Sequence, residues 1–382
     1  MRRVDKPAVS LTSMVLNNES PQQLATKRKP DWLRAKVPGG AGYQQLRGIM
    51  DTHKLNTVCE EAGCPNMGEC WARGVATIMI LGDTCTRACG FCNVKTGKPP
   101  VLDKDEPRRV AESLALMGLK HVVITSVNRD ELKDGGAGIW AETIIRTRES
   151  CPDMSVEVLI PDLEGNWSAL QMIIDAKPHI INHNIECVPR MYPAVRPSAK
   201  YDRSIELLRR VKEQGRVAKT GIMVGIGERD DEVLSLIDDV IAGSRVDAKG
   251  SAISDQRLGE SIGTGEMIVG VDADSETGPP AEGSGSTSDP IAHCPLPTAP
   301  DACDVLTIGQ YLQPTRNHLP IDRWVHPDTF AMYKAEGLKR GFKVVESGPL
   351  VRSSYHADHQ ADMLAGDGIG GLLNRGGDAT VG

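Results

Sequence analysis

Short apolar runs alternate with amphipathic stretches along most of the chain. Most of the apolar runs are nearly continuous, which is typical of strands buried on both faces of a parallel sheet. The runs predict seven strands, at residues 77–81, 121–127, 156–161, 179–185, 220–225, 304–311 and 343–347.

The stretches between these runs have the spacing of helices. In one of them Ile205, Leu208 and Val211 recur at helical intervals, while the charged residues around them can face water. Helices are predicted at residues 107–117, 139–150, 167–176, 201–214, 230–242 and 327–340. Repeated strand-then-helix units predict an α/β fold, either a right-handed wound sheet or an open barrel, with its chemistry in the loops after the strands.

One long segment breaks this alternation. Residues 243–303 contain no aromatic residue, and nine glycines and six prolines stand among them. This composition predicts a flexible, acidic insertion between the fifth predicted helix and the sixth strand. The short apolar run 267–271 is the one candidate strand within it.

Composition and charge narrow the class of protein. The chain has 382 residues, of which 40% are hydrophobic and 25% charged, so it can bury a substantial core. The net charge is −7, and the insertion holds ten acidic and three basic residues, which leaves 41 of the 51 acidic and 41 of the 44 basic residues elsewhere. This balance argues against non-specific nucleic-acid binding, and no apolar run approaches the roughly 18 residues of a membrane span.

Six of the ten cysteines fall between positions 59 and 92. The start of the chain shows no secretory signal pattern, so thiolate ligation of a metal in a reducing compartment is favoured over a disulfide framework. Cys85, Cys89 and Cys92 follow the first predicted strand with three and two residues between them. Three thiolates from one loop leave one iron of a four-iron cluster open to a small molecule. A zinc site with a distant fourth ligand, or a loop without metal, are the alternatives.

A second triplet of cysteines precedes the first predicted strand. Cys59, Cys64 and Cys70 have four and five residues between them, which predicts another cluster close to the first. Taken alone, this triplet also fits a structural zinc site. The other four cysteines lack partners at ligand spacing: two are interpreted as buried or half-buried thiols and two as incidental to the insertion, namely Cys151 and Cys187, and Cys294 and Cys303.

The first triplet, with Phe91 directly before its last cysteine, resembles the signature of the radical S-adenosylmethionine enzymes. The resemblance implies a partial (β/α)6 TIM-like barrel, with N- and C-terminal extensions covering its mouth. It also implies a [4Fe-4S] cluster that binds S-adenosyl-L-methionine at its open iron and cleaves it to a 5′-deoxyadenosyl radical. That chemistry suits a substrate whose unactivated C–H bonds offer no acidic proton.

The second triplet and two terminal motifs narrow the resemblance to the lipoyl synthase family. These motifs are Lys-Pro-Asp-Trp-Leu-Arg at 29–34 and Arg-Ser-Ser-Tyr-His-Ala at 352–357. The likeness covers roughly 28–242 and 303–359, so the insertion is a departure from the family pattern. The alternatives are a different two-cluster radical enzyme, against which the 352–355 motif argues, and a non-catalytic iron–sulfur or zinc-binding protein.

The resemblance implies a reaction and the residues that carry it. The reaction is sulfur insertion at C6 and C8 of a protein-bound octanoyl-lysine to form lipoyl-lysine, with an auxiliary [4Fe-4S] cluster on the second triplet as the sulfur donor. Ser354 would be the fourth ligand of that cluster, whereas without the cysteines 352–355 would be interpreted as a polar turn. The candidate contacts to S-adenosylmethionine, which can equally be loop residues that satisfy backbone groups, are Asn128, Asp130, Asn184, Glu186 and Arg196, with Phe91 beside the cluster.

The same resemblance suggests a domain division and partners. An N-terminal extension (1–74) carries the second triplet, a radical barrel (75–348) contains the insertion, and a C-terminal segment (349–382) carries the serine motif and a flexible tail. The implied partners are an octanoylated carrier (the glycine cleavage H protein or the acyltransferase subunits of 2-oxoacid dehydrogenases), an electron donor such as ferredoxin or flavodoxin, and an iron–sulfur assembly carrier. The short N-terminal arm favours a bacterial cytoplasm over a mitochondrial matrix.

Overall fold

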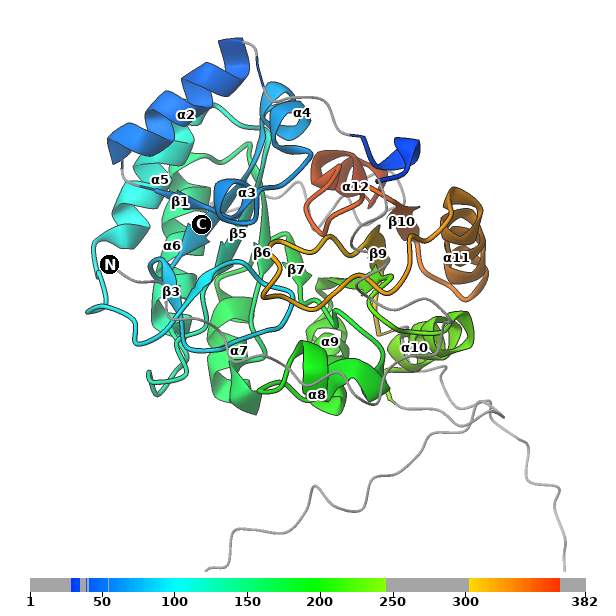
Figure 1. The fold of residues 1–382 in the computed structure, drawn as a ribbon. Coiled ribbons are helices and arrows are strands. Elements are labelled where there is room, and N and C mark those ends of the chain that lie inside the picture. Colours follow the sequence, from blue (N-terminus) through cyan, green and yellow to red (C-terminus); the bar gives the residue numbers. More distant parts are fainter. Residues whose placement is uncertain (1–28, 35–38, 40, 54, 245–301, 365–382) are drawn as a thin grey trace, which may run out of the picture.

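An eight-stranded sheet forms the centre of the part of the chain that the computed structural model describes, residues 29–34, 39, 41–53, 55–244 and 302–364 (Figure 1). Seven strands run parallel, and the short β1 pairs antiparallel with β2 at one edge. In sheet order the strands are β1 Asn56–Thr57, β2 Val75–Ile80, β5 His121–Ser126, β6 Ser155–Leu159, β7 Ile180–Asn182, β8 Val217–Val224, β9 Val305–Gln310 and β10 Val344–Gly348. The two-residue strands β3 (Thr84–Cys85) and β4 (Lys95–Thr96) form a separate parallel pair.

The seven predicted strands and the α/β class with a parallel core are confirmed. The largest differences are at β8, which begins three residues earlier than predicted, at Val217, and at β7, which spans Ile180–Asn182 rather than 179–185. The chain turns there: Glu186 has a φ of 70° and keeps a single isolated bridge to Ile222. Among the described strands the sheet stays open, because β1 and β10 are its edges.

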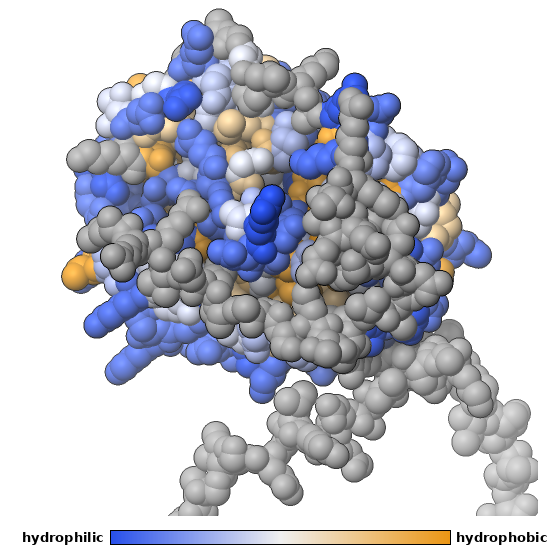
Figure 2. Space-filling view, in the orientation of Figure 1, coloured by the Kyte–Doolittle hydropathy of each residue, from blue (hydrophilic) through white to orange (hydrophobic). Residues whose placement is uncertain are grey.

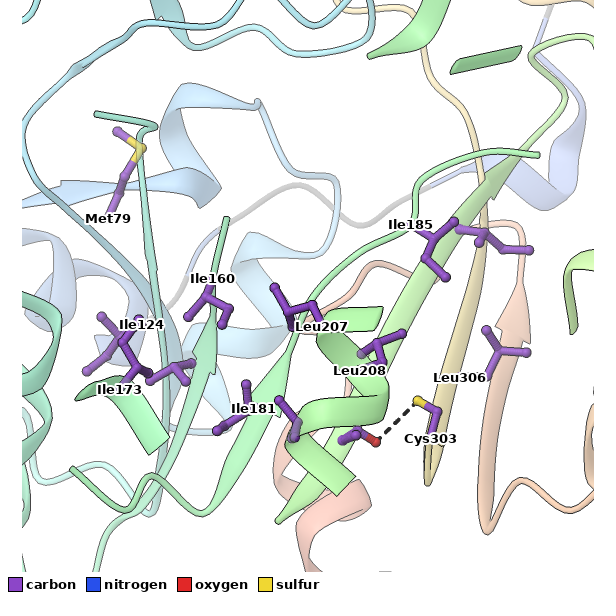
Figure 3. Close-up of a cluster of buried hydrophobic side chains, with 14 of the residues drawn as sticks. Met79, Ile124, Ile160, Ile173, Ile181, Ile185, Leu207, Leu208, Cys303 and Leu306 are labelled. Atoms are coloured by element: carbon purple, nitrogen blue, oxygen red, sulfur yellow. Dashed lines mark hydrogen bonds between the residues drawn. The ribbon is translucent and has the colours of Figure 1, made fainter. Parts of the chain in front are cut away.

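Helices cover one face of the sheet, and the six predicted ones are confirmed to within two residues at each end. Residues in register on neighbouring strands, such as Ile78, Ile124 and Ile181, face these helices. Figure 3 shows Ile173 of one helix, and Leu207 and Leu208 of another, in the same buried cluster. The six helices are α5 Glu106–Met117, α6 Ala137–Ser150, α7 Trp167–Asp175, α9 Tyr201–Glu213, α10 Asp230–Ala242 and α11 Pro327–Lys339.

The structure adds helices that the sequence pattern did not predict: α2 has 13 residues, and the others are shorter. Most of them belong to the segments before β2 and after β10 and to the loops that carry polar side chains. They are η1 Asp31–Leu33, α2 Ala41–His53, α3 Val58–Glu61, α4 Met67–Ala72, η2 Leu163–Gly165, η3 Pro189–Met191, α8 Tyr192–Val195 and α12 Ala357–Leu364.

The opposite, inner face of the sheet is partly filled by α12. Ala361 and Leu364 of this helix form a small buried cluster with Ile180, Val217, Val305 and Val344. These four residues are the first of β7, β8, β9 and β10. The C-terminal helix therefore packs against the amino ends of the strands, away from the carboxyl ends where chemistry is expected.

A buried ion pair crosses the inner face. The ammonium of Lys219 on β8 lies 2.9 Å from the carboxylate of Glu157 on β6, and both side chains are fully buried. Asn182 Nδ2 also donates to Glu157 at 2.9 Å. Burial alone would raise the pKa of Glu157, but the charge of Lys219 outweighs it and lowers the pKa to about 2. The interior of the sheet thus holds an ion pair. Removing either member would be costly, because the other charge would stay buried without a partner.

The insertion departs from and returns to the fold at the amino-end edge of the sheet. The backbone N–H of Ala302 donates to the carbonyl of Ile241 at 3.2 Å, at the end of α10 and just before β9. Residues 245–301, with the candidate strand 267–271 and Cys294, lie outside the described residues.

One cysteine prediction is wrong. Cys303 is not incidental to the insertion but fully buried in the core, where its Sγ donates to the carbonyls of Ala218 at 3.3 Å and Val305 at 3.4 Å (Figure 3). Cys303 and Asp304, directly before β9, already lie beside β8, since the N–H of Asp304 donates to the carbonyl of Ala218 at 2.9 Å. The buried core therefore includes this cysteine. Cys151 and Cys187 are, as predicted, half-buried and buried free thiols.

The surface carries its large apolar side chains in separate places. Figure 2 shows hydrophobic residues in small areas among hydrophilic ones on the face it presents. The most exposed of the described large apolar side chains are Val101 and Leu116, which lie apart in the chain. None of the described helices combines the length and the apolar character that crossing a membrane requires.

Candidate cluster-binding site

The first triplet lies on one loop directly after β3. Cys85 is the last residue of β3, and its carbonyl accepts the N–H of Gly97 at 3.0 Å. The backbone N–H groups of Arg87 and Asn128 donate to Cys85 Sγ at 3.4 and 3.3 Å. Two N–H donors aimed at one sulfur fix the position of that sulfur at the start of the loop.

An ion-pair network anchors this loop to the neighbouring strands. Arg87, whose side chain is only 4% exposed, donates to both carboxylate oxygens of Asp130 at 2.8 and 2.7 Å and lies 2.7 Å from Asp162. Thr86 Oγ1 also donates to Asp130 at 2.8 Å. Asp162 in turn pairs with Arg203 at 3.1 Å. The carboxylate of Asp130, predicted to contact S-adenosylmethionine, is thus engaged in holding the cysteine loop.

The middle of the loop fits closely against two other segments. A Cβ added to Gly90 would lie 2.9 Å from the carbonyl oxygen of Ala194 in α8 and 2.8 Å from the side chain of Leu319. The N–H of Gly90 donates to Val195 at 2.9 Å, and its carbonyl accepts from Leu319 at 3.1 Å. Only glycine fits this position, because every larger residue collides with backbone.

Three of the predicted cofactor contacts gather near Cys89. Burial raises the pKa of the Cys89 thiol, and the charge of Arg196 opposes this. Arg196 donates from Nη1 to the carbonyl of Asn184 at 2.7 Å. Burial likewise raises the pKa of Glu186, whose carboxylate accepts from Asn184 Nδ2 at 3.2 Å. The side-chain oxygen of Asn184 is buried and has no hydrogen-bond partner among the described residues.

The remaining predicted contacts, Asn128 and Phe91, lie beside the first and the last cysteine of the loop. Asn128 donates to Cys85 Sγ from its backbone, and its Nδ2 lies 3.8 Å from the same sulfur. Phe91 is partly buried against the core. The structure therefore brings the first triplet together with Asn128, Asn184, Glu186 and Arg196, at the carboxyl ends of β5 and β7.

The second triplet lies on two short helices before β2. Cys59 is in α3, Cys70 is in α4 and Cys64 is between them. Thr57 caps α3 by accepting the N–H of Glu60 at 3.2 Å. The triplet faces a pocket of about 270 Å³, open mouth included, which is lined by Cys59, Cys64, Asn66, Met67, Cys70, Val75, Thr77, Arg352, Ser354 and Tyr355.

Contacts between the two ends of the chain bring Ser354 into this pocket. Asn66 Nδ2 donates to the carbonyl of Leu350 at 2.6 Å, and Arg73 pairs with Asp358 at 2.8 Å. Tyr355 hydroxyl donates to Glu69 at 3.4 Å. The described parts of the two extensions thus meet beside β2, across the open side of the sheet.

Burial sets the charge state of this pocket by favouring the neutral, protonated form of its thiols. Burial, with the neighbouring thiol of Cys64, raises the pKa of Cys59 to about 11 and contributes to raising that of Cys70 to about 12. Burial also lowers the pKa of Arg352, while Cys64 opposes this. A metal bound here would displace the protons of the thiols and supply the positive charge that holds them as thiolates.

The donor set fits a multinuclear group. Three soft thiolates and one hydroxyl oxygen line one pocket, and in an iron–sulfur cluster each ligand binds a separate iron. Among the described residues, no three His, Cys, Asp or Glu side chains converge as they would on a single ion.

Sequence reasoning missed the residues that position the first triplet. Arg87, Asp162, Gly90 and Leu319 hold the loop without being ligands. Arg87 was visible as a charged residue inside a cysteine loop, and Asp162 as an acidic residue after a strand. The two charges were visible in the sequence, but their pairing was not, and the contact of Gly90 with Leu319 left no signal at all.

Comparisons with known proteins agree with this site. The family model of the radical SAM superfamily matches residues 79–240, and the model of the N-terminal domain of lipoyl synthase matches residues 7–64. A lipoyl synthase of Rubrobacter xylanophilus is 46% identical over 343 residues, covering 89% of each chain. One of Parabacteroides distasonis is 45% identical and covers 87% of this chain and 97% of its own. A mitochondrial lipoyl synthase of Nematostella vectensis is 44% identical and covers 86% and 94%.

These relatives span nearly all of the sequence that carries the two triplets. Identity at this level over most of both chains leaves no room for a non-catalytic carrier or an enzyme of another family. The chain therefore belongs to the lipoyl synthase family, the radical S-adenosylmethionine enzymes that insert sulfur into a protein-bound octanoyl chain.

Proposed function

We propose that the chain holds a second [4Fe-4S] cluster on Cys59, Cys64, Cys70 and Ser354, and that this cluster is the sulfur donor for C6 and C8 of octanoyl-lysine. The observation that carries the proposal is the common pocket of these four residues, which come from opposite ends of the chain. A hydroxyl oxygen is a harder ligand than a thiolate and is less suited to iron in a sulfide cluster. Ser354 is therefore the ligand that can release its iron when sulfide leaves.

The first triplet, in this proposal, holds the cluster that works on S-adenosylmethionine. Cys85, Cys89 and Cys92 bind three irons and leave the fourth for the cofactor, and the bound pair supplies the radical that removes hydrogen from an unactivated carbon. Glu186 and Asn184 present oxygen atoms near Cys89, where they can accept hydrogen bonds from the amine and ribose of the cofactor. Arg196, held by backbone carbonyls beside them, places a positive charge for its carboxylate.

Asp130 and Asn128 have a different part. Asp130 positions the loop through Arg87, and Asn128 donates N–H groups to Cys85, so both fix the cluster rather than the methionine group. Phe91 contributes apolar contact beside the last cysteine. These roles keep the cysteine sulfurs in place while the cofactor binds and leaves.

The domain division and the partners belong to the same proposal. The start of β2 at Val75 and the end of β10 at Gly348 support a barrel over 75–348, with extensions 1–74 and 349–382. The substrate carrier is the glycine cleavage H protein or an acyltransferase subunit of a 2-oxoacid dehydrogenase. Ferredoxin or flavodoxin supplies electrons, and an iron–sulfur assembly carrier restores the second cluster. A cluster held by thiolates needs its cysteines reduced, so the proposal places the chain in a reducing compartment, the bacterial cytoplasm or, in a eukaryote, the mitochondrial matrix.

An anaerobic reconstitution tests this function. The parent chain should bind about eight irons, and the variants Cys85→Ala/Cys89→Ala/Cys92→Ala and Cys59→Ala/Cys64→Ala/Cys70→Ala about four each. With an octanoyl-lysine peptide, S-adenosylmethionine and reductant, mass spectrometry should detect the two-sulfur product from the parent only.

The two triple variants should fail differently. The second should still cleave S-adenosylmethionine but make no sulfur-containing product, and the first should do neither. Cys151→Ala, at a half-buried thiol outside both sites, is the matched control and should keep full activity. A two-sulfur product from the chain that lacks Cys59, Cys64 and Cys70 would contradict the proposal.

A further inference from the structure

A single cationic side chain lines the pocket of the second triplet. Of its ten lining residues, Arg352 alone carries a positive charge, and it lies within electrostatic reach of Cys64. Arg352 is partly buried and lines the pocket.

Arg352 has no carboxylate partner among the described residues. Among those residues its side chain makes a single hydrogen bond, from Nη1 to the carbonyl of the adjacent Val351 at 2.6 Å. Arg87, a buried arginine of the first site, pairs with Asp130 and Asp162 instead. A guanidinium has five N–H donors, and burying its charge is costly unless an anion accepts from it. Most of the donors of Arg352 are therefore available to an anion in the pocket.

Close backbone packing fixes where this guanidinium points. A Cβ on Gly309 of β9 would lie 2.1 Å from the carbonyl oxygen of Val351 and 3.3 Å from Nη1 of Arg352. The turn is closed by Val351 N–H donating to Gly348 at 3.1 Å and Tyr355 N–H donating to Arg352 at 2.9 Å. Arg352 thus reaches from the inner face of β9 to the cysteines beside β2.

We propose that Arg352 is a positioning residue that balances the negative charge of the cluster held by Cys59, Cys64, Cys70 and Ser354 and donates N–H groups to its sulfur atoms. This inference rests on the proposed function of that pocket. A four-iron core with four anionic ligands carries a net charge of about −2, and charge and N–H···S bonds set the reduction potential of such clusters. A fixed cation beside the cluster stabilises its reduced, more negative form and so raises its reduction potential. The same attraction slows the loss of the cluster from the protein.

The test uses the full chain with Cys85→Ala, Cys89→Ala and Cys92→Ala, so that a reconstituted cluster reports on the second triplet alone. Arg352→Gln, Arg352→Lys and Arg340→Gln are added singly. Arg340 is the matched control, because it pairs with Asp238 and Glu336 at the end of α11, far from the pocket. The readouts are the midpoint potential of the cluster, by redox titration, and the rate at which a chelator removes its iron.

We expect Arg352→Gln to shift the potential to a more negative value and to speed iron loss about tenfold, the effect of one lost charge-assisted hydrogen bond. The midpoint potential of the Arg352→Lys cluster should stay close to that of the parent, because lysine keeps the positive charge. Arg340→Gln should match the parent in both readouts. If the Lys variant binds a cluster and the Gln variant binds none, the inference is supported as well, because the positive charge is then required for the cluster to bind.

Three outcomes overturn the inference. They are an Arg352→Gln cluster indistinguishable from the parent, equal impairment of the Gln and Lys variants, and equal impairment of the Arg340 control. Failure of the parent itself to bind a four-iron cluster would overturn the proposed function of the pocket, and this inference with it. Arg352→Gln is also placed in the chain lacking Cys59, Cys64 and Cys70, where normal iron binding at the first triplet shows that the variant folds.

Discussion

The two cysteine triplets of this protein are built in opposite ways. The first lies on one loop of eight residues that is anchored by Arg87, Asp130 and Asp162 and enclosed by α8 and Leu319. The second is spread over two short helices and completed by a turn from the other end of the chain. A local site is positioned by its own loop and the strands beneath it, whereas an assembled site depends on contacts between two extensions. Damage to each should therefore have different consequences.

The largest effect is expected at Arg87. Arg87→Met leaves Asp130 without its cation and Asp162 with Arg203 alone, and breaking a buried pair in this way costs about 3–5 kcal/mol. Iron content should fall from about eight to about four, with the second cluster retained. Arg108→Met is the control, because this arginine forms equally short pairs with Asp105 and Glu112 on an exposed helix face. Loss of both clusters together would show that the sites are not independent.

A smaller effect is expected at Gly90. In Gly90→Ala the new methyl group collides with the carbonyl of Ala194, and overpacking of this kind costs about 1–3 kcal/mol. Iron at the first site should bind less tightly, as measured by chelator competition. Gly48→Ala in α2 is the matched control: a Cβ there meets nothing within 4 Å, so it should be neutral or slightly stabilising. Equal behaviour of the two variants would contradict a close fit around the loop.

Acid should weaken the framework of the first site. His183, fully buried, has its pKa lowered to about 4, first by burial and then by the charge of Arg196. A lowered pKa favours the neutral form, so the unfolded chain takes up the proton first and stability falls as the pH drops from about 6.5 towards about 4. Between pH 7 and pH 5 the free energy of unfolding should decrease by about 2 kcal/mol from this group. Denaturant titrations at several pH values measure it, and His183→Asn should flatten the dependence; an equally steep profile in the variant would contradict it.

The assembled site should respond to a contact between the extensions. Asn66→Ala removes the 2.6 Å hydrogen bond to Leu350 and leaves a partly buried carbonyl without it, at a cost of about 1 kcal/mol. Iron should be lost faster from the second site, with S-adenosylmethionine cleavage at the first unchanged. The same measurement on Gln171→Ala, which loses an exposed bond to Asp175 at 2.9 Å, is the control. Iron loss confined to the first site would contradict the assignment of this contact to the second site.

The smallest effect is expected from the insertion. Its two described ends, Ser244 and Ala302, lie at the amino-end edge of the sheet, whereas the first triplet follows the carboxyl ends. Replacing residues 245–301 by a short glycine–serine linker should leave iron content and turnover within about twofold, because loop-closure entropy changes slowly with length. A large loss of turnover with both clusters intact would show that the insertion takes part in binding the carrier.

The sequence predicted what is local and missed what is assembled. Apolar runs and helical spacing located the strands and the covering helices, because burial on a parallel sheet leaves a continuous pattern. The first triplet was visible in its spacing alone. In contrast, β3 and β4 are two residues long and leave no periodic signal. Helix α12 packs on the inner face of the sheet, but apolar and polar residues are mixed along it and do not mark a buried helix.

Long-range contacts explain the rest. Asn66 and Leu350 are 284 positions apart, so nothing in the local pattern places Ser354 beside the cysteines, and only the family resemblance suggested it. The partner of Asp130 was missed for the same reason, since Arg87 lies 43 positions before it. Cys303 was misassigned because composition marked the end of the insertion less sharply than hydrogen bonding does.

The central claim is that the second triplet holds the sulfur that enters the product. The most direct measurement is a single turnover of chain reconstituted with heavy-isotope sulfide, freed of excess sulfide and supplied with octanoyl-lysine peptide in the presence of ordinary sulfide. We predict a product with two heavy sulfur atoms, at most one per chain, and none from the chain lacking Cys59, Cys64 and Cys70. A product that carries light sulfur from solution would contradict the account.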